Sequence, residues 1–114
     1  MSNGNNHRYK IEKKSGGDGL YHIDDIVIDR SDLNNGVEVI WQAEDTDFEI
    51  WFPKDKHPFP NRGASRGNPS NSRNRQINKK IRKNLESGTY YYGIFCNKTN
   101  TMVEGNSFPK MIIK

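Results

Sequence analysis

The sequence predicts an all-β protein, a small antiparallel β-sandwich of about seven short strands. Segments of alternating apolar and polar residues recur along the chain, and turn-forming residues separate them roughly every 8–12 residues. Five Phe, two Trp and five Tyr supply large side chains for a core, although only 32% of the chain is hydrophobic. No strand–helix–strand unit is visible, which argues against a parallel α/β fold. A chain of 114 residues is expected to form a single domain.

The N-terminal part of the chain contributes the first two predicted strands. Residues 1–6 are polar and are expected to be disordered, so the folded domain spans residues 7–114. Residues 7–14, HRYKIEKK, alternate apolar with charged side chains and predict a short edge strand. Residues 20–28 predict a second strand. The turn-rich connection over residues 29–36 ends in Asn-Gly, a signal for a β-hairpin.

The next two strands show the clearest alternation in the chain. Residues 37–43 and 48–52 each place apolar side chains on one face, and the polar residues 44–47, EDTD, form a turn between them. The residues on the two apolar faces are Val37, Val39, Trp41, Phe48, Ile50 and Phe52. The opposite parity leaves Trp51 on the outer face.

A long irregular basic loop is expected over residues 53–75, which hold four of the five prolines and almost no apolar residue beyond Phe59. Residues 76–85 are ambiguous, because Ile77, Ile81 and Leu85 recur every four residues, a spacing that suits a helix stripe or one face of a strand. We favour a strand, because predicted strands precede and follow this segment.

Two strands close the chain. Residues 88–95, GTYYYGIF, place Tyr90, Tyr92 and Ile94 on one face and Tyr91 on the other. Residues 108–114 form the last strand, in which Met111 and Ile113 share a face. The prediction is therefore one sandwich domain over residues 7–114, with residues 53–75 as an inserted loop.

Cellular location is inferred from what the sequence contains. A single cysteine cannot form an intrachain disulfide, so nothing indicates an oxidising compartment. The N-terminal residues include no apolar signal-peptide core, and no apolar run nears the roughly 20 residues that span a bilayer. A cytoplasmic protein without a membrane contact is expected.

Several of these segments resemble cupredoxin-like domains. The stretch VEVIWQAEDTDFEIWFPKDKHPF resembles the middle of that fold, and SGTYYYGIF with the terminal FPKMIIK resembles its last two strands. The resemblance covers roughly residues 20–52 and 85–114, and it implies a Greek-key β-sandwich. It also implies where copper ligands would lie.

The copper ligands that this family uses are missing from the matching positions. Blue copper sites combine two imidazoles, a thiolate and a weak axial thioether. Residues 45–49, where the first His is expected, contain none, and no His follows Cys96 within six residues. Cys96 and Met102 could supply the two sulfur ligands, but no imidazole joins them. The resemblance therefore implies a scaffold without copper, and no cofactor is expected.

Catalysis is not indicated by any residue cluster. Cys96 has Lys98 nearby in the sequence but lacks a base that would activate it as a nucleophile. The carboxylates of residues 44–47 lack the glycine and the spacing of a calcium loop, and a solvated turn explains them. We therefore expect a protein that is not an enzyme.

The basic segment is the feature most suggestive of function. Residues 54–86 contain ten Lys and Arg against two acidic residues, whereas the rest of the chain is net acidic. Spaced cations among Ser, Asn and Gly suit contact with an acidic protein surface or with nucleic-acid phosphates. Exposed rings could anchor such a partner. The predicted contact residues are Arg62, Arg66, Arg73, Arg75, Lys80, Arg82, Trp51 and Tyr91.

The sequence thus predicts a non-enzymatic binding or accessory module. Two alternatives stay open. One is a metal-binding or redox relative of the cupredoxins that uses Cys96, and the other is a small barrel that binds single-stranded nucleic acid. Oligomeric state is also open, since an exposed edge strand such as residues 7–14 could pair between chains.

Overall fold

The computed structural model describes residues 6–13, 21–53, 56–59, 70–103 and 109–114. Eleven strands and one short helix are present in these residues. In chain order they are β1 (Asn6–Lys13), β2 (Tyr21–His22), β3 (Ile26–Ile28), α1 (Arg30–Leu33), β4 (Val37–Ala43), β5 (Phe48–Trp51), β6 (Ser70–Asn71), β7 (Gln76–Ile81), β8 (Gly88–Tyr91), β9 (Gly93–Cys96), β10 (Thr101–Met102) and β11 (Lys110–Ile113). Residues 1–6 are predicted to be disordered. Asn6 instead begins β1, and residues 1–5 lie outside the described residues.

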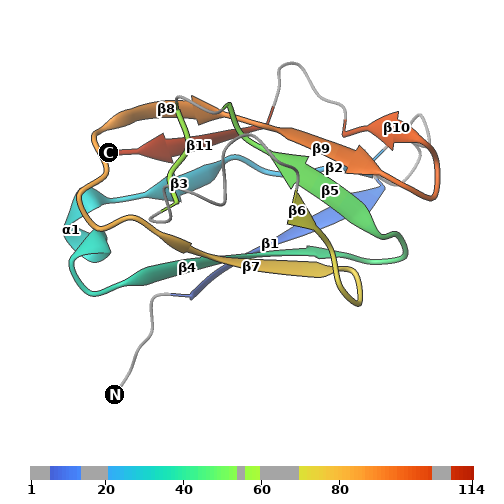
Figure 1. Ribbon diagram of the computed structural model, residues 1–114, viewed down its shortest axis with the longest axis horizontal. Helices are drawn as coiled ribbons and strands as arrows, with labels where there is room; N and C mark the ends of the chain where they lie inside the picture. Colours follow the sequence, from blue (N-terminus) through green and yellow to red (C-terminus); the bar gives the residue numbers. More distant parts are fainter. Residues whose placement is uncertain (1–5, 14–20, 54–55, 60–69, 104–108) are drawn as a thin grey trace.

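The strands form two layers (Figure 1). One layer is the sheet β2–β1–β4–β7, of which β4 and β7 are drawn in the lower half of the view. The sheets β10–β9–β5–β6 and β3–β11–β8 make the other layer, because β8 runs on into β9 with only Tyr92 between them. The all-β prediction is confirmed.

The expectation of purely antiparallel pairing is wrong for two strand pairs. β1 runs parallel to β4, with Asn6 opposite Glu38 and Ile11 opposite Ala43, and β11 runs parallel to β3. Parallel neighbours need a long connection between them, and the chain between β1 and β4 passes through the other layer before it returns. The sheets are therefore mixed.

The single strand expected over residues 20–28 is two strands in different layers. β2 pairs with β1, and β3 pairs with β11. The exposed residues Asp24 and Asp25 lie where the chain crosses between the layers. Since carboxylates favour water over a core, they suit this crossing point.

The Asn-Gly signal does not close a hairpin. Residues 30–33 form α1, which buries Leu33, and Gly36 follows with a φ of 84°. That positive φ explains the glycine. β3 and β4 belong to different layers, so this connection carries the chain across the sandwich.

Residues 76–85 contain a strand, as favoured. β7 pairs antiparallel with β4, which places Ile77 opposite Trp41 and Ile81 opposite Val37. Lys79 shares their inward parity, and its ammonium lies 5.4 Å from the centre of the Phe59 ring. A cation–π contact therefore accommodates a charge on this face.

The predicted loop over residues 53–75 is partly built into the fold where it is described. Phe59 is buried against Phe52, with ring centres 5.0 Å apart. β6 pairs with β5, and Ser72 donates a backbone hydrogen bond to the carbonyl of Phe48 at 2.8 Å. Residues 54–55 and 60–69 lie outside the described part of the chain.

The core lies between the layers and is filled by the side chains that each strand points inward. The apolar faces predicted for residues 37–43 and 48–52 are buried, as are Tyr90, Tyr92, Met111 and Ile113. Among the described residues, no helix has the length and apolar character to cross a membrane.

Candidate functional site

The exposed apolar side chains gather on one face of the molecule. Among the described residues, the large hydrophobic side chains that are exposed are Val27 at 40%, Trp51 at 36% and Tyr91 at 51%. All three point outward from the β8–β9 layer, because each alternates with buried neighbours. We call this outer surface the aromatic face. The outward positions of Trp51 and Tyr91 agree with the sequence prediction.

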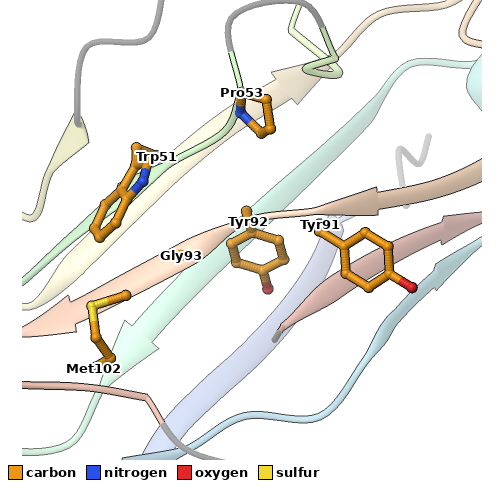
Figure 2. Close-up of a pocket in the computed structure, with 6 residues that line it drawn as sticks. All are labelled: Trp51, Pro53, Tyr91, Tyr92, Gly93 and Met102. Atoms are coloured by element: carbon orange, nitrogen blue, oxygen red, sulfur yellow. The ribbon is translucent and has the colours of Figure 1, made fainter. Parts of the chain in front are cut away.

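A cleft of about 350 Å³ opens on the aromatic face between Trp51 and Tyr91 (Figure 2). Its wall also includes Pro53 and Met102, and its floor is the backbone of Tyr92 and Gly93. This lining is mostly apolar, with a phenol and an indole at the surface. Such side chains combine a large contact area with a polar tip, which suits a binding surface.

Gly93 determines where the indole lies. Trp51 pairs with Gly93 across β5 and β9, and a Cβ placed at Gly93 would come within 2.9 Å of Trp51 Cζ2 and 3.2 Å of Met102 Cε. The absent side chain lets the ring pack directly on the backbone. Trp51 is thereby held in place by packing.

The predicted basic residues lie elsewhere. Arg73 and Arg75 are exposed in the turn before β7, where Arg75 has a φ of 61°. Lys80 points outward from β7, in the layer opposite the aromatic face. Arg82 is half-buried, and its guanidinium donates to the Phe59 carbonyl at 3.4 Å.

The structure thus brings Trp51 and Tyr91 together but places Lys80 on the far side of the sandwich, farther away than the spacing of about 10 Å between two packed sheets. Arg62 and Arg66 fall outside the described residues, so their contact role stays a prediction. Sequence reasoning missed Val27 on the aromatic face. Its position between Ile26 and Ile28 was the available signal, since alternation points it outward.

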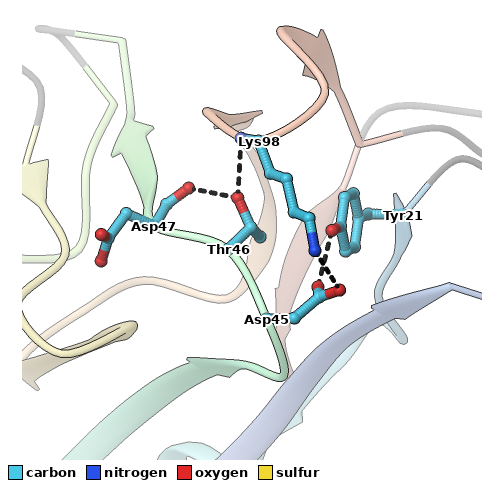
Figure 3. Close-up of polar contacts among 5 residues, drawn as sticks. All are labelled: Tyr21, Asp45, Thr46, Asp47 and Lys98. Atoms are coloured by element: carbon cyan, nitrogen blue, oxygen red, sulfur yellow. Dashed lines mark hydrogen bonds and ion pairs between the residues drawn. The ribbon is translucent and has the colours of Figure 1, made fainter.

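Two carboxylates of residues 44–47, those of Asp45 and Asp47, connect separate segments of the chain (Figure 3). Tyr21 Oη donates to Asp45 Oδ1 at 2.6 Å, and Lys98 Nζ donates to Asp45 Oδ2 at 3.1 Å. Asp47 Oδ1 accepts hydrogen bonds from Ser72 Oγ at 2.9 Å and from the Arg75 amide at 3.2 Å. The acidic residues of this turn are exposed, as predicted, whereas Thr46 between them is buried; Asp45 and Asp47 hold neighbouring segments together.

These bonds change the acidity of their partners. The hydrogen bond from Tyr21 and then that from Lys98 lower the pKa of Asp45. Burial, followed by the hydrogen bond to Asp45, raises the pKa of Tyr21. A neutral phenol beside an ionised carboxylate is a stable structural pair, so this cluster does not need a catalytic role to explain it.

The sulfur atoms expected for a copper site diverge. Cys96 is fully buried at the end of β9, whereas Met102 pairs with Phe95 and lines the outer cleft. Burial, together with the charge of Asp45, raises the pKa of Cys96 to about 11, which keeps it a thiol at neutral pH. One of the histidines considered as a metal ligand has a structural contact: His57 Nδ1 accepts a hydrogen bond from the Phe59 amide at 3.2 Å.

Metal ligation finds no further support in the part of the chain that the structure describes. No group of three or more His, Cys, Asp or Glu side chains is placed there to hold a metal ion.

No protein-family model matches this sequence, and no curated protein matches it either. Function is therefore inferred from geometry and chemistry.

Proposed function

We propose that this chain is a non-enzymatic binding module that contacts a protein partner through the aromatic face. The observation that carries the proposal is the cleft that Trp51 and Tyr91 form over Gly93 on the aromatic face, where Val27 is also exposed. Contiguous exposed apolar surface is costly in water and marks interaction sites. Trp and Tyr are also the residues that most often dominate binding energy at interfaces.

A protein suits this face better than nucleic acid does. Single-strand binding combines stacking rings with an excess of cations along the groove. Lys110, the cation next to Tyr91 in the sheet, forms an ion pair with Asp25 at 3.5 Å, and Glu49 shares the outer parity of Trp51. Phosphates would find little positive charge beside these rings.

The scaffold we propose is a cupredoxin-like Greek-key sandwich without copper. Two β layers and the divergent directions of Cys96 and Met102 support this proposal. Adding copper(II) tests it, because a thiolate–copper site absorbs visible light intensely. An intense band that disappears in Cys96→Ser would contradict the proposal and revive the redox alternative.

The single cysteine supports a cytoplasmic location, in line with the sequence expectation.

The proposed contact is tested by affinity capture with matched variants. Wild type, Trp51→Ala and Tyr91→Ala are compared, with Lys80→Gln as a control on the opposite layer. Proteins captured by wild type and by Lys80→Gln but lost with both ring variants are identified, and their affinities are then measured with purified components. We expect each ring variant to weaken binding by about thirtyfold, as for an interface hot spot.

Two outcomes oppose the proposal. Partners that bind wild type and both ring variants equally would exclude the aromatic face as the contact. Partners lost only when residues 60–69 are deleted would assign the contact to the basic loop that includes Arg62 and Arg66.

A further inference from the structure

The outer face of the β1–β4–β7 sheet is polar except at Ile40, which its neighbours cover. Strand register places three rows of outward side chains across it, because directly paired residues point the same way. The rows are Asn6–Glu38–Lys80, Arg8–Ile40–Asn78 and Lys10–Gln42–Gln76. We call this surface the basic face. It lies on the layer opposite the aromatic face.

Two hollows lie at opposite ends of the β4–β7 ladder. The larger, about 530 Å³, includes Glu38, Lys80, Arg82 and Lys83 in its wall. The smaller, about 210 Å³, includes Lys10, Gln42, Glu44 and Arg75 in its wall. Each hollow therefore contains cations and opens beside one end of the polar rows.

Positive charge predominates on this surface. Among the described residues, the face and the two hollows hold six cations and three carboxylates. The cations are Arg8, Lys10, Arg75, Lys80, Arg82 and Lys83, and the carboxylates are those of Glu12, Glu38 and Glu44. Lys10, Lys80 and Lys83 are exposed, and among the described residues no side-chain hydrogen bond or ion pair joins any of the three to a partner.

We propose that the basic face binds an extended acidic segment of a protein, separately from the contact on the aromatic face. Charge complementarity supports this occupant, since exposed cations here have carboxylates as their natural partners. The geometry also matches, because side chains on one face of a strand recur about every 6.6–6.8 Å, as they do along an extended peptide. Alternate carboxylates can therefore meet successive rows.

The mixed sign of the face favours a polypeptide over a nucleic acid. Glu12, Glu38 and Glu44 would repel a backbone that carries a charge at every phosphate, whereas an acidic protein segment can place neutral side chains opposite them. The face also presents no exposed aromatic ring among its described residues, so bases would lack a stacking platform.

A peptide titration tests the proposal on the full chain. The probes are a poly-glutamate peptide and a poly-thymidine oligonucleotide of equal charge, each titrated at low and moderate salt. Wild type is compared with Lys10→Gln/Lys80→Gln. The control is Lys56→Gln/Lys114→Gln, which removes the same charge from exposed positions outside the face. Circular dichroism confirms that all variants are folded.

We expect poly-glutamate to bind wild type and the control equally, and Lys10→Gln/Lys80→Gln roughly three- to tenfold more weakly. Glu38→Gln should bind the peptide about twofold more tightly, because it removes a negative charge that repels poly-glutamate from the row that contains Lys80. Trp51→Ala should leave this binding unchanged, which separates the basic face from the aromatic face.

Three results would overturn the proposal. They are no peptide binding at low salt, equal weakening in the control variant, and tighter binding of the oligonucleotide than of the peptide at the same salt. The last result would assign the face to nucleic acid. None of them bears on the partner proposed for the aromatic face, which is tested with the Trp51→Ala and Tyr91→Ala variants.

Discussion

The two tryptophans, ten residues apart, have opposite environments. Trp41 on β4 is fully buried; its Nε1 donates to Tyr92 Oη at 3.1 Å, and its ring meets those of Tyr92 and Phe52 edge-on. Trp51 on β5 lies on Gly93 and keeps 36% of its surface exposed. Strand parity produces the difference, since one side chain points between the layers and the other points away from them. Trp41 therefore belongs to the core, and Trp51 lies at the surface, where we propose that it binds a partner.

The largest expected effect comes from shortening each tryptophan. Trp41→Ala should lower the free energy of unfolding by about 3–5 kcal/mol, because it leaves a cavity where the two layers meet. Trp51→Ala should lower it by less, about 1–2 kcal/mol, since part of that side chain is already in water and its loss leaves no cavity between the layers. Urea unfolding followed by circular dichroism measures both. Equal losses would remove the distinction between the two residues.

A smaller effect is expected from one hydroxyl beside Trp41. Tyr92→Phe leaves the indole N–H of Trp41 buried without an acceptor, at a cost of about 1–3 kcal/mol. The adjacent Tyr91→Phe removes an exposed hydroxyl and should be close to neutral. Thermal unfolding of the two variants provides the comparison. Similar melting temperatures would mean that the Trp41 hydrogen bond does not contribute to stability.

The smallest effect concerns the polar connection at Asp45, which differs from the aromatic core in its pH dependence. The folded pKa of Asp45 is lowered from 3.8, so its stabilisation is complete above that value and disappears as the pH falls through it toward the folded pKa. Because Asp45 is exposed, we expect a contribution of at most about 1 kcal/mol. The difference in stability between wild type and Asp45→Asn, measured from neutral to acidic pH, should shrink below pH 3.8.

The same pH series provides a control within the core. Trp41 and Phe52 carry no ionisable group, so the loss caused by Trp41→Ala should not change over that range. If the loss for Asp45→Asn were also constant with pH, Asp45 would act through packing and not through its charge.

Local pattern was a sound guide to which side chains face inward. Alternation predicted the buried faces of β4, β5 and β8, and with them the outward positions of Trp51 and Tyr91. It failed at residues 20–28, where an apparently continuous strand divides between two layers. It also could not reveal the basic face, because Arg8 and Lys80 are far apart in the chain and meet through their shared neighbour β4.

The sequence by itself determined that the chain is mostly β, because side chains alternate along a strand whatever its partners are. Only the tertiary structure decided which strands are neighbours, that β1 and β4 run parallel, and that Trp51 and Tyr91 lie in the layer opposite Lys10 and Lys80. Pairing joins residues that are distant in sequence, and their choice depends on how the whole core packs. The division of the surface into an aromatic and a basic face follows from that packing.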